Sequence, residues 1–336
     1  MPVPTVLICQ TAESRVEGKM FRAKSQSHKF MPLLRVILIV LAAISLPMVS
    51  RAEPPTSQEL QQDLKRYREM VAENPGNYLY LNSLGETLFL LGNFDEALRH
   101  FRKLVELTPH AKDEVVSYNI AQTLYKLEKY EEAYREFLQA AAASDKTESE
   151  KTLTLGDVYG EYFAAVCLYR TGKIEEAAKL LSDLIAERAA TFERYARETT
   201  FESQTFEKTD EGLVWNGVLV FKDKEGFEAF IKTKVLIGKR SLNYFGAHVI
   251  RALCKNKLND RAGAMQDLDA ALSVNPESGL ALFLRGKWLM LDKREAEAKQ
   301  SLAAAAAKGF KGVKGGLPEE LEVIVPLSYS PTLYFQ

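Results

Sequence analysis

The sequence is poor in cysteine, proline and glycine, and it carries no excess of either charge. Its 336 residues include 3 Cys, 12 Pro and 19 Gly. Three cysteines cannot build a disulfide scaffold, and this little proline and glycine excludes collagen-like and proline-rich chains. The 44 Lys and Arg residues are balanced by 45 Asp and Glu residues, so no basic field points to a nucleic-acid partner. A hydrophobic fraction of 46% is that of a globular protein.

Motifs for catalysis and metal binding are missing as well. The four histidines, His28, His100, His110 and His248, stand in no HExxH context, and the cysteines form no CxxC pair. The sequence has no phosphate-binding P-loop, no GxGxxG and no GxSxG. We therefore expect a protein that is not an enzyme and that needs no cofactor or metal ion. Cys167 and Cys254 are expected to be buried free thiols.

One long apolar run lies near the start of the chain. Residues 36–49, VILIVLAAISLPMV, are uncharged, but the run is shorter than the roughly 20 residues that span a bilayer. Basic residues precede it, and the small residues Ser50 and Ala52 follow it. This order is typical of a secretory signal peptide over residues 1–52, cleaved after Ala52. An uncleaved membrane anchor is the alternative, and Met31 competes with Met1 as the true start.

Cleavage after Ala52 would change the charge of the protein. The remaining chain has 37 Lys and Arg against 43 Asp and Glu, which is a net charge of −6. Acidic character favours solubility and disfavours polyanionic partners. We therefore expect an exported protein, periplasmic or secreted, with no nucleic-acid partner. It would be anchored to the membrane by residues 36–49 only if that segment is retained.

The rest of the chain is periodic and alternates short helices with tight turns. Gly92 suits the left-handed position that ends a first helix, and Pro109 would stop a second one. Gly85 and Ala97 are small where the two helices would cross, and Phe101 would fill the space between them. Similar offsets recur further along, at Ala121, Tyr130, Ala133 and Phe137; at Ala165, Gly172, Ala177 and Leu181; at Ala252, Asn259, Ala264 and Leu268; and at Gly286, Ala298 and Leu302.

This pattern resembles the tetratricopeptide repeat, which has Leu, Gly and an aromatic residue in its first helix and Ala, an aromatic residue and Pro in its second. The resemblance covers residues 57–191, as an N-terminal cap helix and three repeats, and residues 244–310, as two further repeats. It implies an all-α solenoid of helical hairpins. Each hairpin would bury its apolar face against its neighbours.

Two segments, 192–243 and 311–336, do not follow the period. In the first, Asn216-Gly217 separates residues 213–215 from 218–221, which predicts a β-hairpin with a two-residue turn. Residues 223–232 are predicted to form a short helix, and we interpret 192–243 as an irregular insert with a local aromatic core. In the C-terminal tail, residues 321–327 have strand character. Residues 329–336 would either pair with the hairpin or lie in the groove of the solenoid.

In tetratricopeptide proteins the first helix of each repeat lines a concave groove that holds extended peptides. The resemblance implies a peptide-binding groove made of Asn82, Glu86, Phe89, Tyr118, Asn119, Gln122, Tyr125, Tyr162, Tyr169 and Arg170. Tyrosine is common at binding hot spots. Asn119 and Gln122 would hydrogen-bond a peptide backbone, and Arg170 would pair with an acidic side chain. Among the positions that clamp a terminal carboxylate in one subclass, only Asn119 matches, so we do not expect that clamp.

These observations predict an exported, non-enzymatic scaffold or adaptor that binds a protein or peptide partner in the groove and helps to assemble an envelope complex. Two alternatives stay open. One is a structural component that assembles with itself, and the other is an enzyme that uses the 192–243 insert. The sequence names neither the partner nor the oligomeric state.

Overall fold

The structure of the chain is a computed structural model, which describes residues 55–107, 114–144, 155–210, 212–216, 219–312, 317–318 and 321–322. The predicted leader, residues 1–52, and residues 329–336 of the tail lie outside the described residues. The chain divides into two compact units. One consists of residues 55–192 together with the residues from 236 onward, and the other of residues 193–235.

Helix α2, Ser57–Glu73, precedes the repeats of the larger unit. Its start is a capping box, because the backbone N–H of Glu59 donates to the Thr56 hydroxyl at 3.2 Å and the Glu59 carboxylate accepts from the Thr56 backbone at 2.7 Å. It ends at Glu73, and Asn74 is its C-cap residue, just before Pro75. Leu60 and Leu64 are its buried residues, so one stripe of the helix packs against the repeats.

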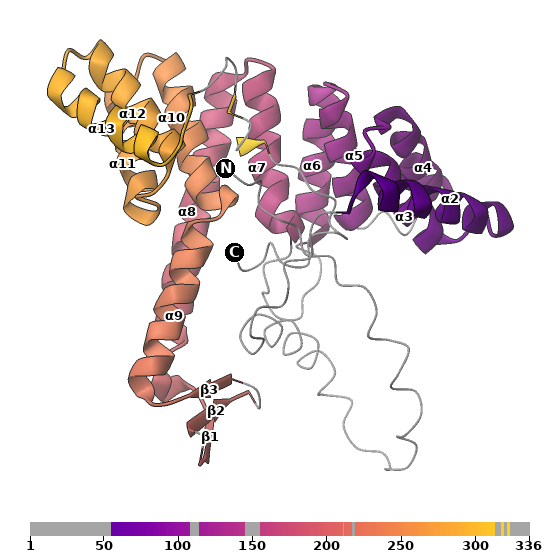
Figure 1. Cartoon of the computed structure of the whole chain (residues 1–336), viewed down its shortest axis with the longest axis horizontal. Helices are drawn as coiled ribbons and strands as arrows, with labels where there is room; N and C mark the ends of the chain where they lie inside the picture. Colours follow the sequence, from indigo (N-terminus) through magenta and orange to yellow (C-terminus); the bar gives the residue numbers. More distant parts are fainter. Residues whose placement is uncertain are drawn as a thin grey trace. The chain divides into compact units, whose positions relative to one another are not determined.

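Five pairs of helices follow α2 (Figure 1). They are α3 (Tyr78–Leu90) with α4 (Phe94–Leu107), α5 (Glu114–Lys126) with α6 (Tyr130–Ser144), α7 (Leu155–Arg170) with α8 (Ile174–Glu198), α10 (Ala247–Lys257) with α11 (Arg261–Val274), and α12 (Gly279–Leu291) with α13 (Glu295–Ala307). A π-helical turn, Leu242–Gly246, leads into α10. We call the first member of each pair helix A and the second helix B. Buried residues of all five pairs belong to the interior of the array.

Each A helix ends in the same turn. The turn residue has a left-handed backbone in every pair, with φ of 79° at Gly92, 60° at Glu128, 80° at Gly172, 64° at Asn259 and 61° at Lys293. The next residue donates its N–H to a carbonyl five residues back, at 2.8–2.9 Å in all five pairs. This is the Schellman arrangement, which satisfies the carbonyls that a helix end leaves free.

Small residues allow the two helices of a pair to cross closely. A Cβ atom added to Gly85 of α3 would lie 2.5 Å from the Phe101 ring of α4, so only glycine fits there. Ala97 in α4 and Ala133 in α6 are both fully buried. The predicted roles of Gly85, Ala97 and Phe101 in the crossing are therefore confirmed.

The smaller unit, residues 193–235, contains a sheet of three strands in the order β1-β2-β3: β1 (Phe206–Thr209), β2 (Gly212–Trp215) and β3 (Leu219–Phe221). A short 3₁₀ helix, Phe201–Ser203, comes before it, and helix α9, Lys224–Lys239, comes after it. Both strand pairs are antiparallel. The predicted hairpin and helix are present, while strand β1 was not predicted and α9 is longer than residues 223–232.

The hairpin register differs from the prediction by one residue. Trp215 pairs with Leu219 and Leu213 with Phe221, so residues 216–218 connect the strands in place of a two-residue turn. Asn216 has the expected left-handed φ of 54°. A slip of one residue reverses the face of every side chain in a strand. The observed register puts Leu219 and Phe221 against the fully buried Phe227 and leaves Val220 exposed.

The predicted fold class is therefore confirmed: the protein is an all-α array of helical hairpins with a small β-containing insert. Described residues 317–318 and 321–322 of the C-terminal segment form no strand. The remainder of the strand predicted for residues 321–327 lies outside the described residues.

Candidate functional site

The A helices of the first three pairs carry all ten residues that were assigned to the groove. The structure places these residues differently from the prediction of an exposed binding wall: every one except Arg170 is buried. Tyr118 is 3% exposed and packs edge-on against Phe137 and Phe163, with ring centroids 5.6 Å and 6.4 Å away. As a core residue between α5, α6 and α7, Tyr118 offers no surface to a peptide.

Two other aromatic residues of the set hold neighbouring elements together. Phe89, at the end of α3, packs edge-on against Phe94 at the start of α4, with centroids 5.3 Å apart. Tyr169, near the end of α7, has the Lys257 ammonium 4.1 Å from its ring centroid, and Lys257 ends α10. That cation–π contact joins the third repeat to the fourth, although the insert separates the two repeats in the sequence. Structural contacts therefore account for both residues.

Four polar residues form a buried ladder between α3 and α5. The Asn82 amide donates to Glu86 at 2.7 Å, and the Asn119 amide donates to Asn82 at 3.2 Å and to Glu86 at 3.1 Å. Gln122 donates to Asn119 at 2.8 Å, while its own amide oxygen is buried without a hydrogen-bond partner in the part of the chain that the structure describes. Because an unmatched buried acceptor is costly, this end of the ladder suits an N–H donor.

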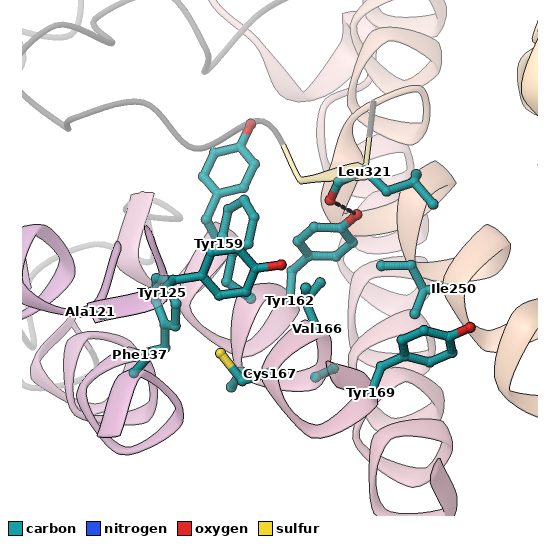
Figure 2. Packing of buried hydrophobic residues seen from close by; sticks show 14 of the residues in the cluster. Ala121, Tyr125, Phe137, Tyr159, Tyr162, Val166, Cys167, Tyr169, Ile250 and Leu321 are labelled. Carbon is teal, nitrogen blue, oxygen red and sulfur yellow. Dashed lines mark hydrogen bonds between the residues drawn. The ribbon is translucent and has the colours of Figure 1, made fainter. Parts of the chain in front are cut away.

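A second polar cluster lies on α5 and α7, where residues 321–322 contact both helices. The Tyr162 hydroxyl donates to the Leu321 carbonyl at 2.9 Å (Figure 2). Arg170 donates from Nε to the Glu322 carboxylate at 2.7 Å and from Nη2 to its other oxygen. The Tyr125 hydroxyl donates to the same carboxylate. Three of the predicted residues thus converge on a main-chain carbonyl and a carboxylate.

The surroundings of this cluster alter the protonation of its members. Burial raises the pKa of Tyr162 well above its usual value, and burial together with the bond to Glu322 raises the pKa of Tyr125. Burial by itself would lower the pKa of Arg170, but its bonds to Glu322 and Tyr125 outweigh that effect and raise it. Both tyrosines therefore stay neutral donors and Arg170 stays a cation, which is the state that binds a carboxylate.

Residues Leu317, Leu321 and Glu322 were not part of the predicted site. Their approach joins positions 152 or more residues apart in the chain, and no helical or strand periodicity encodes such a contact. The sequence did offer one signal, the composition of the segment. Leu-Glu after a glycine-rich stretch is a short motif of an apolar and an acidic residue, which complements the predicted surface of Tyr and Arg.

A third polar cluster lies between α10 and α11. Asp267 is 3% exposed, and Arg251, Lys255 and His248 approach its carboxylate at 2.5 Å, 2.9 Å and 3.2 Å. Burial would raise the pKa of Asp267, but these three partners together lower it. Lys255 thus faces the interior of the helix pair, where it is paired with a buried acid. We interpret this cluster as a structural bond between the helices.

Cys167 and Cys254 are buried and free, as predicted. Burial raises the pKa of Cys254 to about 12, so its thiol is unreactive at neutral pH. Within the residues that the structure describes, no group of three or more His, Cys, Asp or Glu side chains is arranged to hold a metal ion. Among the same residues, no helix combines the length and the apolarity that a bilayer crossing needs.

Comparisons with known proteins match parts of the chain. Two family models of the tetratricopeptide repeat match residues 78–111 and 118–193. No curated protein matches the sequence. Among solved structures, the chain is similar to BtubC from P. vanneervenii, with 10% identity and a TM-score of 0.49 over 78% of this chain and 96% of that one.

Two other solved structures are similar over most of their length. YrrB, a tetratricopeptide protein with an unusual peptide-binding site, is 13% identical, with a TM-score of 0.41 over 73% of this chain and 93% of that one. A thermophilic tetratricopeptide protein of Thermus thermophilus is 18% identical, with a TM-score of 0.38 over 73% and 95%. Likenesses this distant transfer no function. The family models and the fold agree, however, because residues 78–111 and 118–193, which match the tetratricopeptide repeat, lie in the part of the chain that forms the first three helical hairpins.

Proposed function

We propose that this protein is an exported, non-enzymatic scaffold that binds a protein or peptide partner on the A helices of its second and third repeats. Tetratricopeptide repeats generally mediate protein–protein interaction. The part of the surface that we assign to the partner is the one around Tyr125, Tyr162 and Arg170, which we call the α5–α7 face. Assembly of an envelope complex is the process we expect it to serve.

One observation carries this proposal: the α5–α7 face already binds a segment from outside the repeats. Tyr162 donates to a main-chain carbonyl, which every peptide has, and Arg170 with Tyr125 holds a carboxylate. Side chains that hydrogen-bond a backbone group and an acidic group from another segment are the elements of peptide recognition.

The export half of the proposal rests on residues 1–52, which lie outside the described residues. Their basic stretch, short apolar run and small residues before position 53 support secretion. Mass spectrometry of the N-terminus of the native protein tests this directly. A mature N-terminus at Glu53 supports cleavage, whereas a retained leader supports the membrane anchor.

Photocrosslinking from defined positions tests the binding face. Tyr130 is partly buried and its ring packs edge-on against Tyr125, 5.2 Å away. A benzoylphenylalanine at Tyr130 would therefore sample a partner on the α5–α7 face. The matched control is the same replacement at Tyr195 of α8, which is 39% exposed.

We expect a specific crosslinked product from position 130 and none from position 195. The product should disappear when Arg170→Glu is added, because the carboxylate of the partner would then meet a like charge. Equal crosslinking from both positions, or crosslinking that is indifferent to Arg170→Glu in a chain of unchanged helicity, would rule out this face.

Self-assembly is a second candidate function, and exposed apolar residues in the first and last repeats support it. Leu79, near the start of α3, is 68% exposed, and Leu291, at the end of α12, is 65% exposed. Stacking between chains would bury such residues. Light scattering over a hundredfold range of concentration tests this, and a mass equal to one chain throughout would exclude it.

A further inference from the structure

The contact that Leu317, Leu321 and Glu322 make with the repeats has the composition of a bound ligand. Leu317 and Leu321 are 5% and 1% exposed and belong to the core of the repeat unit. Glu322 pairs with Arg170, and their side chains are 13% and 29% exposed. The contact thus combines a buried apolar anchor with a charged pair at its edge, which is the anatomy of a protein–peptide interface.

This contact supplies the acceptor for the Tyr162 hydroxyl. Tyr162 is fully buried, and its hydroxyl donates to the Leu321 carbonyl. A buried hydroxyl without an acceptor is destabilising, so the face favours a state in which a backbone carbonyl lies over Tyr162. Any extended peptide can supply that carbonyl, which makes the site indifferent to whether the peptide belongs to this chain.

The segment that contains Leu317, Leu321 and Glu322 is tethered to the last repeat, because it follows helix α13 in the same chain. Helix α13 ends at Ala307, and Gly309 and Gly312 follow with left-handed φ of 73° and 99°. The sequence adds Gly315 and Gly316 before Leu317. A short tether holds its end at an effective concentration of about 1 mM. If the free segment bound with a Kd of about 100 μM, the tethered one would occupy the face about nine-tenths of the time.

We propose that the segment around Leu321-Glu322 is an internal ligand that competes with the partner for the α5–α7 face. The inference rests on the proposed function and specifies it further. The partner presents an apolar residue followed directly by an acidic one, the apolar side chain taking the place of Leu321 and the carboxylate taking the place of Glu322 on Arg170. Partner binding releases the segment, and the free protein is held in the closed state.

A labelled peptide with the sequence of residues 315–328, GGLPEELEVIVPLS, tests the competition in fluorescence anisotropy. The full chain is compared with its Glu322→Lys variant, in which the internal segment is repelled by Arg170. The matched control is Glu297→Lys, which makes the same charge change on α13, where the Glu297 side chain is 45% exposed. A further chain, Arg170→Ala with Glu322→Lys, removes the site itself.

We expect Glu322→Lys to bind the peptide about tenfold more tightly than the full chain, because the internal competitor is gone. Glu297→Lys should bind like the unaltered chain, and the Arg170→Ala double variant should bind far more weakly than Glu322→Lys. Circular dichroism confirms that each variant is folded. Should Glu322→Lys fail to fold, Glu322→Gln removes the charge while keeping the size, and a smaller increase in affinity is expected.

Two outcomes would overturn the proposal, and they have different consequences for the proposed function. Equal, tight binding to the full chain and to Glu322→Lys would mean that the face accepts peptides but that the segment does not block it, so the proposed function would stand. No binding of the peptide to any folded variant would mean that the segment is not a ligand. In that case crosslinking from Tyr130, which uses no such peptide, still decides whether a partner binds.

Discussion

The Arg170 guanidinium at the end of α7 pairs with the Glu322 carboxylate, 152 residues further along the chain. Arg170 is the one residue of the ten assigned to the groove that is exposed. The pair links the third repeat to the C-terminal segment and brings the Leu321 carbonyl over Tyr162. It is thus the electrostatic part of the contact on which the proposed partner specificity depends.

A double-mutant cycle between Arg170→Ala and Glu322→Ala measures this pair. We expect a coupling free energy of about 1 kcal/mol, because the side chains are partly exposed and the pair is bidentate. Chemical denaturation of the four chains gives the four unfolding free energies. Strictly additive losses would mean that the two side chains do not interact in solution.

Overpacking a helix crossing tests the repeat register. Ala133 in α6 is fully buried, so Ala133→Leu should lower the free energy of unfolding by about 1–3 kcal/mol. The control is Ala142→Leu in the same helix, where the alanine is exposed and the change should be within about 0.5 kcal/mol. A melting temperature that Ala133→Leu leaves unchanged would contradict the predicted crossing.

The turn of the second repeat can be improved. Glu128 has a φ of 60°, a conformation that costs a residue with a Cβ about 1 kcal/mol or more. Glu128→Gly should therefore stabilise the protein by up to about 1 kcal/mol. Arg135→Gly, at an exposed position inside α6, should instead destabilise it by about 1 kcal/mol. Thermal unfolding compares the two, and destabilisation by both changes would count against the turn assignment.

The buried Asp267 makes stability depend on acidic pH. Its pKa is lowered in the folded protein, so its contribution is present above about pH 4 and is lost as the pH falls below that value. Asp267→Asn should cost about 3 kcal/mol at pH 7, since it leaves Arg251 and Lys255 without their acid. The difference between the two chains should shrink between about pH 4 and pH 2.

Unfolding by urea at several pH values checks this pattern. A difference between Asp267→Asn and the unaltered chain that stays constant from about pH 7 to pH 2 would mean that Asp267 has the same pKa in the folded and the unfolded chain, which contradicts its ion pairing. The control is Asp269→Asn in the same helix, because Asp269 pairs with Arg285 while its side chain remains 60% exposed. That change should have little effect at any pH.

The repeats were accessible to prediction because their determinants are local. Gly92 and Gly172 indicate turns by their residue type, and Gly85 with Phe101 indicates a helix crossing through a fixed spacing. Glu128 and Lys293 occupy the same turn conformation without a residue type that indicates it. There the neighbouring helices impose the backbone, and only the spacing from other repeats points to the turn.

The site was only partly accessible. The family positions identified Tyr125, Tyr162 and Arg170, which do converge on Leu321 and Glu322. They also assigned Tyr118 to the groove, although it is a core residue. Whether a tyrosine on an A helix is buried depends on the rings that neighbouring helices bring to it, here Phe137 and Phe163. A position within one repeat contains no information about those partners. The role of the remaining groove residues in binding stays a prediction.

The sequence by itself determined the helical hairpins, their turns and the location of the β-containing insert, because these follow from contacts within one repeat or between adjacent ones. Only the tertiary structure decided the register of the hairpin in the insert, the burial of the polar ladder and the docking of Leu321 and Glu322 on α5 and α7. Each of these depends on residues that local patterns do not connect, and the free energy that selects them arises only once the elements have packed.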